Sequence, residues 1–226
     1  MHTDQTARIL WHEGRTPVSE RFDDVYFSPV NGLDETRHVF LKGNDLPGRF
    51  RAGFHVAELG FGTGLNVLAA VMMWRAANAR GTLHFTSFEA SPMAREDLFA
   101  ALGAFPAIRV LASEILADYA PGKTRMHATD LRLNIIWGDA RETLPAWKGQ
   151  ADAWFLDGFS PAKNPELWSD ELMAQVARRT APDGSFATYT AAGHVRRALA
   201  QAGFTVARMP GYGRKKHMTT GRLTSG

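Results

Sequence analysis

Two short motifs in this 226-residue sequence combine residue types that can bind a charged small molecule and move a proton. In ELGFGTGLN (58–66), three glycines alternate with other residues directly after an apolar run. Glycine permits a tight turn and the close approach of a ligand, which the free amides of a following helix would then face. In FLDGFSPAKNPELW (155–168), Asp157 ends a second apolar run and precedes two prolines that stiffen the loop. A carboxylate placed there can orient an attacking amine or accept its proton.

The glycine spacing narrows the choice of ligand. Gly60, Gly62 and Gly64 follow the pattern G-x-G-x-G, whereas dinucleotide-binding proteins use G-x-G-x-x-G. Glu58 lies two residues before the first glycine. An acid at that position suits S-adenosylmethionine, which carries an ammonium and a sulfonium, better than a pyrophosphate. The alternative interpretation is a glycine-rich turn that is needed only for packing.

Two further acids follow other predicted strands. Glu89 lies near the end of LHFTSFEA (83–90), where a carboxylate can accept hydrogen bonds from both ribose hydroxyls of an adenosine. Asp139 follows the next long strand in the run WGDA, a position that often bonds the adenine amino group in adenosylmethionine enzymes. Each has a simpler interpretation as a solvated acid at a strand end. Together with the glycine loop, they predict a ligand that contains adenosine.

Positive charge gathers at the end of the chain. After Asp183 the sequence contains seven Lys and Arg and no acid, which leaves 19 basic and 23 acidic residues before that point. Within GYGRKKHMTTG (211–221), Tyr212 could stack on a base, and the three adjacent basic residues could bind phosphates. In a strand, these three would point to alternating faces. A polyanion, nucleic acid above all, is one interpretation of this charge, and a solubilising surface is the other.

The elements that must position these residues alternate along the chain from Phe54 onward. This alternation predicts a doubly wound, mostly parallel α/β sheet with helices on both faces, which binds ligands at the carboxyl ends of its strands. Residues 1–50 are polar and turn-rich, and we expect an extension packed on a domain over 51–226. The predicted strands are 54–60, 83–90, 152–158, 185–190 and 204–210, with a hairpin around Thr129 and Asp130. The predicted helices are 65–80, 92–102, 171–181 and 193–202, with a helical piece near 111–119.

Composition excludes several other classes of protein. Hydrophobic residues make up 45% and charged residues 22%, so the chain is neither disordered nor collagen-like. No apolar run reaches the ~18 residues of a membrane span, and the polar N-terminus does not resemble a signal peptide. Cysteine is absent, and His217 has no second ligand at a suitable spacing for a metal. We therefore expect a cytoplasmic protein that binds neither a membrane nor a metal.

Taken together, the motifs resemble the methyltransferase half of the MnmC family of bifunctional tRNA 5-methylaminomethyl-2-thiouridine biosynthesis proteins. LDGFSPAKNP and the RKK run are much more specific than the glycine loop. The resemblance implies a Rossmann-like methyltransferase fold and methyl transfer from S-adenosylmethionine to the exocyclic amine of 5-aminomethyl-2-thiouridine at the tRNA wobble position. It runs through FDDVYFSPVNGLDETRHVFLKGNDLP (22–47), ELGFGTGLN, FEASP (88–92), GDA (138–140), LDGFSPAKNPELW (156–168) and GYGRKKHM (211–218).

The same resemblance implies roles for individual residues. Asp157 is the expected catalytic residue, and Tyr26 is expected to close over the cofactor or substrate. The family's bifunctional members continue into a flavin-dependent oxidoreductase, so a separate oxidoreductase acting earlier in the pathway is an expected partner besides tRNA. The expected cofactor-binding residues are Tyr26, Glu58, Gly60, Phe61, Gly62, Gly64, Asn66, Glu89, Asp139, Asp157 and Phe159. The expected substrate-binding residues are Pro161, Lys163, Tyr212, Arg214, Lys215 and Lys216.

Three other functions stay open at this point. A methyltransferase could act on a small-molecule amine or a protein amine instead of tRNA. A Rossmann-type NAD(P) oxidoreductase fits the fold, although the glycine spacing opposes it. A non-catalytic RNA-binding module would use the basic end alone and would leave the three acids at strand ends without a purpose.

Overall fold

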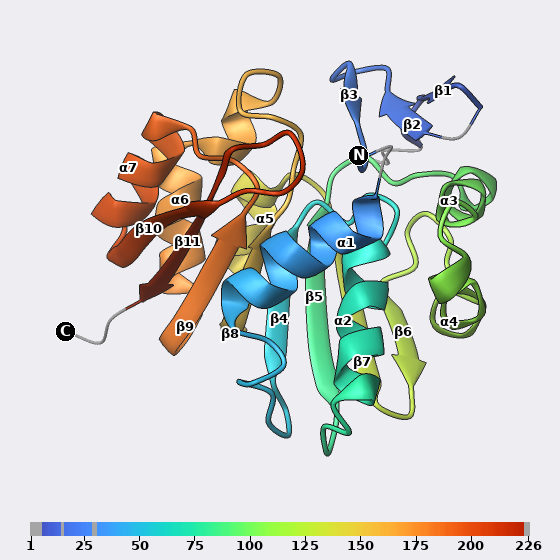
Figure 1. Ribbon diagram of the computed structural model, residues 1–226, viewed down its shortest axis with the longest axis horizontal. Helices are drawn as coiled ribbons and strands as arrows, with labels where there is room; N and C mark the ends of the chain where they lie inside the picture. The colour runs from blue at the N-terminus through green and yellow to red at the C-terminus, as the bar shows by residue number, and fades with distance from the viewer. Residues whose placement is uncertain (1–5, 15, 29–30, 224–226) are drawn as a thin grey trace.

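The computed structural model describes residues 6–14, 16–28 and 31–223, and its centre is an eight-stranded sheet (Figure 1). The order across the sheet is β10-β11-β9-β8-β4-β5-β7-β6, and the five strands from β9 to β7 are parallel. The doubly wound, mostly parallel sheet is thus confirmed. The central strands are β4 (His55–Leu59), β5 (Leu83–Glu89), β7 (Leu131–Trp137), β8 (Ala151–Leu156) and β9 (Thr180–Thr188). The outer strands are β6 (Arg125–Ala128), β10 (Phe204–Pro210) and β11 (His217–Leu223).

The order of the strands reverses at β4. The chain runs outward from β4 through β5 to β7, and then returns to place β8 on the other side of β4. A crevice opens at such a reversal, outside the carboxyl ends of the strands. The glycine loop follows β4 and Asp157 follows β8, so both motifs lie at this point.

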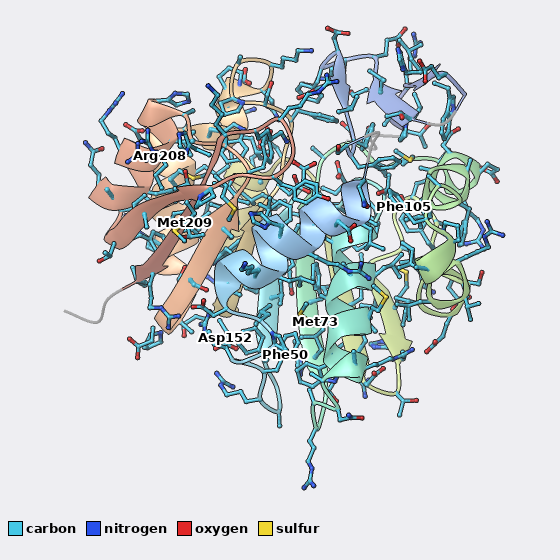
Figure 2. All side chains as sticks on the ribbon, viewed as in Figure 1. Phe50, Met73, Phe105, Asp152, Arg208 and Met209 are labelled. Carbon is cyan, nitrogen blue, oxygen red and sulfur yellow. The ribbon has the colours of Figure 1, made fainter. Side chains whose placement is uncertain are left out.

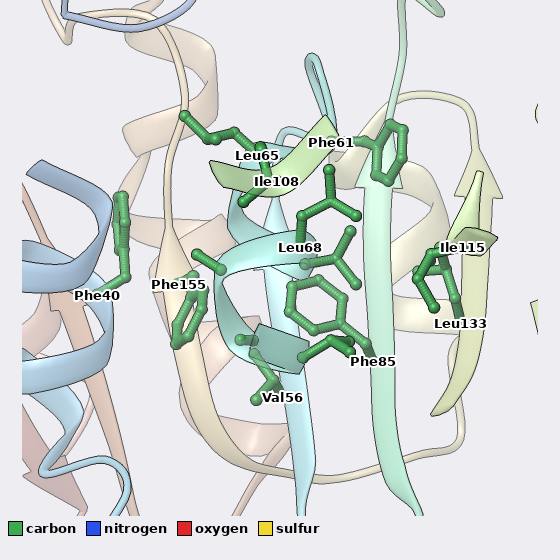
Figure 3. Packing of buried hydrophobic residues seen from close by; sticks show 14 of the residues in the cluster. Phe40, Val56, Phe61, Leu65, Leu68, Phe85, Ile108, Ile115, Leu133 and Phe155 are labelled. Carbon is green, nitrogen blue, oxygen red and sulfur yellow. The ribbon is translucent and has the colours of Figure 1, made fainter. Parts of the chain in front are cut away.

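Helices cover both faces of the sheet because its central strands are apolar on both sides. All six residues of β8 are buried, as expected for a parallel strand between two helical layers. On one face, Leu65 and Leu68 of α2 (Leu65–Ala76) belong to the same buried cluster as Phe85 of β5, and Leu68 lies next to that ring (Figure 3). α3 (Arg95–Leu102), η3 (Pro106–Ile108) and α4 (Arg109–Ile115) extend this layer. The other face is covered by α5 (Ala140–Ala146), η4 (Pro165–Trp168), α6 (Asp170–Arg178) and α7 (Gly193–Gln201).

The N-terminal part is more regular than the sequence predicted. After a small sheet of β1 (Ile9–His12), β2 (Thr16–Ser19) and β3 (Asp24–Val25), the chain is helical through α1 (Gly32–Thr36), η1 (Arg37–Leu41) and η2 (Lys42–Asn44). Figure 1 shows this blue helical segment crossing the front of the sheet. Asn31 caps α1 by accepting a hydrogen bond from the Asp34 amide. The expectation of a turn-rich segment was therefore wrong for residues 32–44, where a cap and a buried apolar face stabilise a helix.

Buried Asn44 anchors this helical segment to the sheet. Its Nδ2 donates to the carbonyl oxygens of Phe40 (2.9 Å) and Trp154 (3.2 Å). Its Oδ1 accepts a hydrogen bond from Ser185 Oγ at 2.5 Å. One side chain thereby joins η2 to β8 and β9, which fixes where α1 meets the crevice.

Further differences from the prediction lie in the second half of the chain, including one α-helix that was not predicted. The helix predicted over 171–181 ends at Arg178, and β9 already includes Pro182 and Gly184, because the backbone of Ala151 hydrogen-bonds to Arg179 and starts the ladder there. The basic run does not lie in a strand: Gly213 has φ +58° and the Lys215 amide bonds to Tyr212 O (3.0 Å), which makes a turn between β10 and β11. The unpredicted helix is α5.

The end of the sheet opposite the crevice is closed by charged side chains. Asp152 accepts hydrogen bonds from the His55 amide (2.8 Å) and from Arg51 Nη2 (2.6 Å). Figure 2 shows Asp152 near the loops at that end, and Arg208 and Met209 on the outermost strand. These contacts hold the loop before β4 and lie far from the residues singled out in the sequence.

Within the described residues, no single helix is long and apolar enough to cross a membrane. α3 taken together with η3 and α4 meets the criteria of length and composition, but the two halves are bent by 117°.

Candidate functional site

A cavity of about 910 Å³ occupies the crevice at the carboxyl ends of β4, β5 and β8. Its floor is the glycine loop, and its walls are the loops that follow β5, β7 and β8. Residues 21–28 and α1 cover it from the N-terminal side, and the turn 212–215 closes another side. Segments from both ends of the chain thus complete a site whose floor is made by the central strands.

The glycine loop follows a path that requires glycine at Gly60 and Gly62. Gly60 has φ +89°, and a Cβ there would lie 2.2 Å from the carbonyl oxygen of Asp157. Gly62 has φ +53° and faces the Tyr26 ring. Gly64, at φ +75°, precedes α2 without a side-chain cap, so the first amides of that helix stay available to a ligand. The loop is therefore packed against the backbone after β8 and open toward the cavity.

Glu89 lines the cavity and also holds its floor. Its Oε2 accepts a hydrogen bond from the Gly62 amide (2.9 Å), and its Oε1 accepts one from the Ser91 amide (2.7 Å). Burial raises the pKa of Glu89, while the loop amides act to lower it. A carboxylate has about four acceptor positions, so Glu89 keeps capacity for the hydroxyls of a ligand.

Glu58, which the sequence placed against the cofactor, lies beneath the cavity instead. It is fully buried, and its carboxylate accepts hydrogen bonds from Asn66 Nδ2 (2.7 Å) and Ser87 Oγ (2.6 Å). Burial raises its pKa well above the usual range. The same Asn66 Nδ2 donates to Asp157 Oδ2 (2.7 Å), and Thr36 Oγ1 donates to Asn66 Oδ1 (3.0 Å). Glu58 does not face the cavity, and its contribution to the site is to hold the Asn66 side chain that donates to Asp157.

Asp157 is the group best suited to proton transfer. Burial raises its pKa to about 7, although the Asn66 hydrogen bond and the Lys215 charge both act to lower it. An acid–base group is most effective when its pKa lies near the working pH. Asp157 lines the cavity beside the glycine loop and can therefore accept a proton from a ligand bound there.

Asp139 also lines the cavity, but its carboxylate is engaged locally. It caps α5 by accepting from the Arg141 amide (2.8 Å), and it pairs with the Arg141 guanidinium at 2.6 Å. Arg141 lowers the pKa of Asp139 and keeps it ionised. An adenine amino group would share this carboxylate with Arg141.

Aromatic rings form the wall between the N-terminal segment and the loop after β8. Phe22 stacks on Phe159 with centroids 4.7 Å apart, and the edge of Tyr26 packs against the same ring at 5.1 Å. Burial raises the pKa of Tyr26, so its hydroxyl stays neutral. Phe61 lines the floor and stacks on Tyr119 at 5.7 Å. These rings give the cavity an apolar wall for a flat ligand.

The predicted substrate-binding residues separate into two groups. Tyr212, Arg214 and Lys215 line the cavity, whereas Pro161, Lys163 and Lys216 do not. Lys163 pairs with Asp23 (Nζ–Oδ2 3.0 Å), and Asp24 Oδ2 accepts from the Ser160 amide (2.8 Å). The proline-containing loop is thereby joined to the N-terminal segment.

Glu35, Thr36 and Tyr189 also line the cavity, and the sequence did not single them out. Lys215 Nζ lies 2.9 Å from Glu35 Oε1 and 4.0 Å from the centroid of the Tyr189 ring. Glu35 is 180 residues from Lys215 in the chain, so no local pattern predicts the pair. The sequence feature that could have pointed to Glu35 is its position in the first turn of a helix capped by Asn31.

Among the residues that the structure describes, no group of three or more His, Asp or Glu side chains is placed to hold a metal ion.

Comparison with known families and proteins gives a consistent result. A family model described as S-adenosyl-L-methionine-dependent methyltransferase matches residues 106–224. The tRNA 5-methylaminomethyl-2-thiouridine biosynthesis bifunctional protein MnmC of Chromobacterium violaceum is 46% identical over 99% of this chain and 35% of its own length. The protein of the same name from Caulobacter vibrioides is 47% identical over 92% of this chain and 36% of its own length. The chain spans about a third of the length of these curated relatives.

Solved structures show the same fold. MNMC2 from Aquifex aeolicus superposes with a TM-score of 0.73 at 24% identity, over 99% of this chain and 72% of the other. Spermidine synthase from Thermotoga maritima superposes with a TM-score of 0.58 at 12% identity, over 100% and 72% of the two chains.

Proposed function

This chain belongs to a family of S-adenosyl-L-methionine-dependent methyltransferases, and on that premise we propose that it methylates the exocyclic amine of 5-aminomethyl-2-thiouridine at the tRNA wobble position. The curated relatives are named for the biosynthesis of the corresponding methylaminomethyl product. Under this proposal, residues 1–50 are an extension that completes the site of a methyltransferase domain over 51–226. We also propose a cytoplasmic location and, as a partner, an oxidoreductase activity that acts earlier in the same pathway.

The observation that carries the proposal is Asp157, a buried carboxylate with a pKa of about 7 that lines the cavity beside the glycine loop. An alkylamine is protonated at neutral pH and must lose a proton before it attacks a methyl group. A nearby carboxylate with a near-neutral pKa suits that step better than one with the usual pKa of about 4.

The residues around the cavity fit S-adenosylmethionine. The open amides of α2 suit its carboxylate, and Glu89 suits its ribose hydroxyls. The rings of Tyr26 and Phe159 and the carboxylate of Asp139 line the same cavity and suit its adenine. When bound, this cofactor supplies a methyl group on a positively charged sulfur, open to in-line displacement by a nucleophile.

The remaining steps belong to residues of this chain. Asp157 accepts a proton from the acceptor ammonium, so that an N–H bond breaks and a carboxylic O–H bond forms. The amine nitrogen then holds the free electron pair that makes the new N–C bond. Asn66 keeps the Asp157 carboxylate in place, because its Nδ2 is fixed between Asp157 and the buried Glu58. The enzyme otherwise works by holding the reacting atoms in line.

Glu89→Ala is expected to weaken S-adenosylmethionine binding by about 1–3 kcal/mol, the scale for hydrogen bonds to a charged group. The variant loses the ribose acceptor and also releases the Gly62 and Ser91 amides. Isothermal titration calorimetry measures the change. Glu96→Ala removes an exposed acid that does not line the cavity and should bind the cofactor like the wild type. Equal affinities in the two variants would contradict the role of Glu89.

Binding of tRNA should depend on the turn between β10 and β11. Arg214 and Lys216 are exposed there, at the mouth of the cavity or next to it, and no ion pair of either is found in the described part of the chain. Reversing both charges to Glu should weaken tRNA binding and flatten its log–log salt dependence by roughly one unit per lost phosphate contact. Affinities measured at several salt concentrations give this slope.

The matched control reverses Arg80 and Arg132, two exposed basic residues beyond the end of α2 and near the start of β7, at the end of the sheet opposite the cavity. It changes the net charge equally and should keep the wild-type slope. If both double variants shift the slope by the same amount, the turn contributes only net charge.

The proposed function itself is tested by methyl transfer. The purified chain is incubated with labelled S-adenosylmethionine and tRNA that carries 5-aminomethyl-2-thiouridine, and the nucleosides are analysed by mass spectrometry. We expect the mass of one methyl group to be added to that nucleoside. Methylation of a small amine or a protein, with none of this tRNA, would overturn the proposal and favour the other acceptor classes.

A further inference from the structure

The Lys215 side chain enters the cavity from a solvent-exposed turn and ends between an acid and an aromatic ring. Its Nζ lies 2.9 Å from Glu35 Oε1 and 4.0 Å from the centroid of the Tyr189 ring. The ammonium therefore has a charged partner and lies over the face of a π system, the two features by which proteins recognise cationic amines. All three residues line the same cavity as Asp157.

The two groups that receive this ammonium are held by the fold. Glu35 lies in the first turn of α1, where its side chain is only 13% exposed. The Tyr189 hydroxyl donates to the carbonyl oxygen of Gly158 at 2.7 Å, which fixes the ring beside the residue that follows Asp157. Glu35 and Asp157 are also close enough for the charge of Glu35 to act to raise the pKa of Asp157. The two groups that contact the ammonium, the Glu35 carboxylate and the Tyr189 ring, are therefore held in fixed positions.

Lys215 itself is held much less firmly. Its side chain is 47% exposed, and it projects from a turn whose Gly213 has φ +58°. Ion pairs at this degree of exposure typically contribute no more than about 1 kcal/mol. A ligand ammonium that brings contacts of its own can therefore replace Lys215, and Glu35 would keep a cationic partner throughout the exchange.

We propose that Glu35 and the face of Tyr189 form the recognition site for the ammonium group of the methyl acceptor, and that Lys215 occupies this site until the acceptor displaces it. Lysine ends in a primary alkylammonium, the same group that an aminomethyl acceptor presents. The inference rests on the proposed function in one respect, that the acceptor is a primary amine. It adds the residues that select such an acceptor and a built-in competitor for their site.

The exchange keeps one positive charge near Asp157. While Lys215 is in place, its positive charge acts to lower the pKa of Asp157. An acceptor ammonium at the same position supplies the same charge. Displaced Lys215 returns to the exposed turn beside Arg214 and Lys216.

The test uses benzylamine, an aromatic aminomethyl compound that is protonated at neutral pH, and the whole chain saturated with S-adenosylhomocysteine. Binding is measured by ligand-observed NMR titration. Lys215→Gln removes the competitor and should lower the Kd of benzylamine about two- to fivefold, the equivalent of a partly exposed ion pair. Glu35→Gln should raise that Kd about tenfold or more, as expected for loss of a charged hydrogen-bond partner. Tyr189→Leu, which removes the ring, should also raise it.

Two controls separate displacement from general charge effects. Lys216→Gln makes the same charge change at the adjacent position, which does not line the cavity, and should leave the Kd unchanged. In the double variant Glu35→Gln, Lys215→Gln, removal of the lysine should give no further gain. Benzyl alcohol, the uncharged analogue, should not distinguish the wild type from Lys215→Gln.

A Kd for benzylamine that stays the same or rises in Lys215→Gln would overturn the proposal, because removing a competitor must increase the affinity for benzylamine. This assay requires no methyl transfer. Failure of the proposed function would appear separately, as wild-type enzyme that does not methylate the aminomethyl tRNA.

Discussion

Asp157→Asn is expected to lower the turnover number about 100-fold or more, the usual scale for loss of a general base. The affinity for S-adenosylmethionine should change much less, because the amides of α2 and Glu89 are untouched. Asparagine keeps one acceptor oxygen that can still orient an amine, so Asp157→Ala should be slower again. Steady-state kinetics for both substrates separate the effects on turnover and affinity.

The same residue should set the pH dependence of the wild type. Because Asp157 has a pKa of about 7, its carboxylate gains a proton as the pH falls through neutrality and can no longer accept one from the amine. The rate should therefore fall on the acid side with a midpoint near that value. Asp157→Asn should lack this acid limb.

A second readout distinguishes lost chemistry from a damaged fold. The pKa of Asp157 is about 7 in the folded chain, against 3.8 for an unperturbed Asp. As the pH rises between these values, the unfolded chain loses this proton while the folded chain retains it, so stability falls, and the loss is complete above the folded-state pKa. Asparagine does not titrate. The stability of Asp157→Asn relative to wild type should therefore increase by about 2–4 kcal/mol from pH 4 to pH 8.

Urea unfolding at several pH values measures this difference, and Asp118→Asn, at an exposed position outside the cavity, should show no such trend. An Asp157→Asn enzyme that is slow and also less stable at pH 8 than the wild type would indicate structural damage. Near wild-type turnover in Asp157→Ala would leave the proposed mechanism without a base.

Local pattern was sufficient to place the glycine loop and Asp157 together. Each ends an apolar run that is too short for a helix, and the alternation of strands and helices requires a parallel sheet, so both had to lie at the same edge. The structure adds that β4 and β8 are neighbours at the reversal of strand order. That adjacency brings the Gly60 backbone against the carbonyl oxygen of Asp157.

Side-chain direction could not be predicted in the same way. Glu58 belongs to the same motif as the glycines, but it lies inside β4 and points into the layer below, where Ser87 and Asn66 satisfy its carboxylate. Asp139 ends a strand and also starts α5, so its carboxylate binds Arg141. A motif fixes where a residue lies along the chain, whereas its hydrogen-bond partners depend on neighbouring segments.

The contacts made by the ends of the chain depend entirely on the tertiary fold. Glu35 and Lys215 meet only because Asn44 holds the first helical segment across β8 and β9 while β10 and β11 bring the basic turn to the same edge. No sequence pattern around Glu35 or Lys215 predicts that the two residues pair. The sequence showed the basic run as charge alone. Only the turn geometry determines that Arg214 and Lys215 line the cavity and that Lys216 does not.

Gly60→Ala tests the packing that holds Asp157 over the glycine loop, and it should destabilise the protein by about 3 kcal/mol or more. The new Cβ would lie 2.2 Å from the Asp157 carbonyl oxygen and 3.3 Å from its carbon, so backbone must move. Gly53→Ala is the matched control, since Gly53 has a similar φ of +73° against +89° but nothing within 4 Å of the added Cβ. It incurs only the positive-φ cost, about 1 kcal/mol.

Urea unfolding of the two variants measures the stability difference, and cofactor titration with turnover measures the effect on the site. Displacement of the Asp157 backbone should carry its carboxylate away from Asn66, so Gly60→Ala should lose activity even where it remains folded. Gly53→Ala should retain wild-type turnover, because its loop lies at the opposite end of β4 from the cavity. Equal losses of stability in both variants would show that the backbones after β4 and β8 are not in close contact, and Asp157 would then have to be positioned by its side-chain hydrogen bond alone.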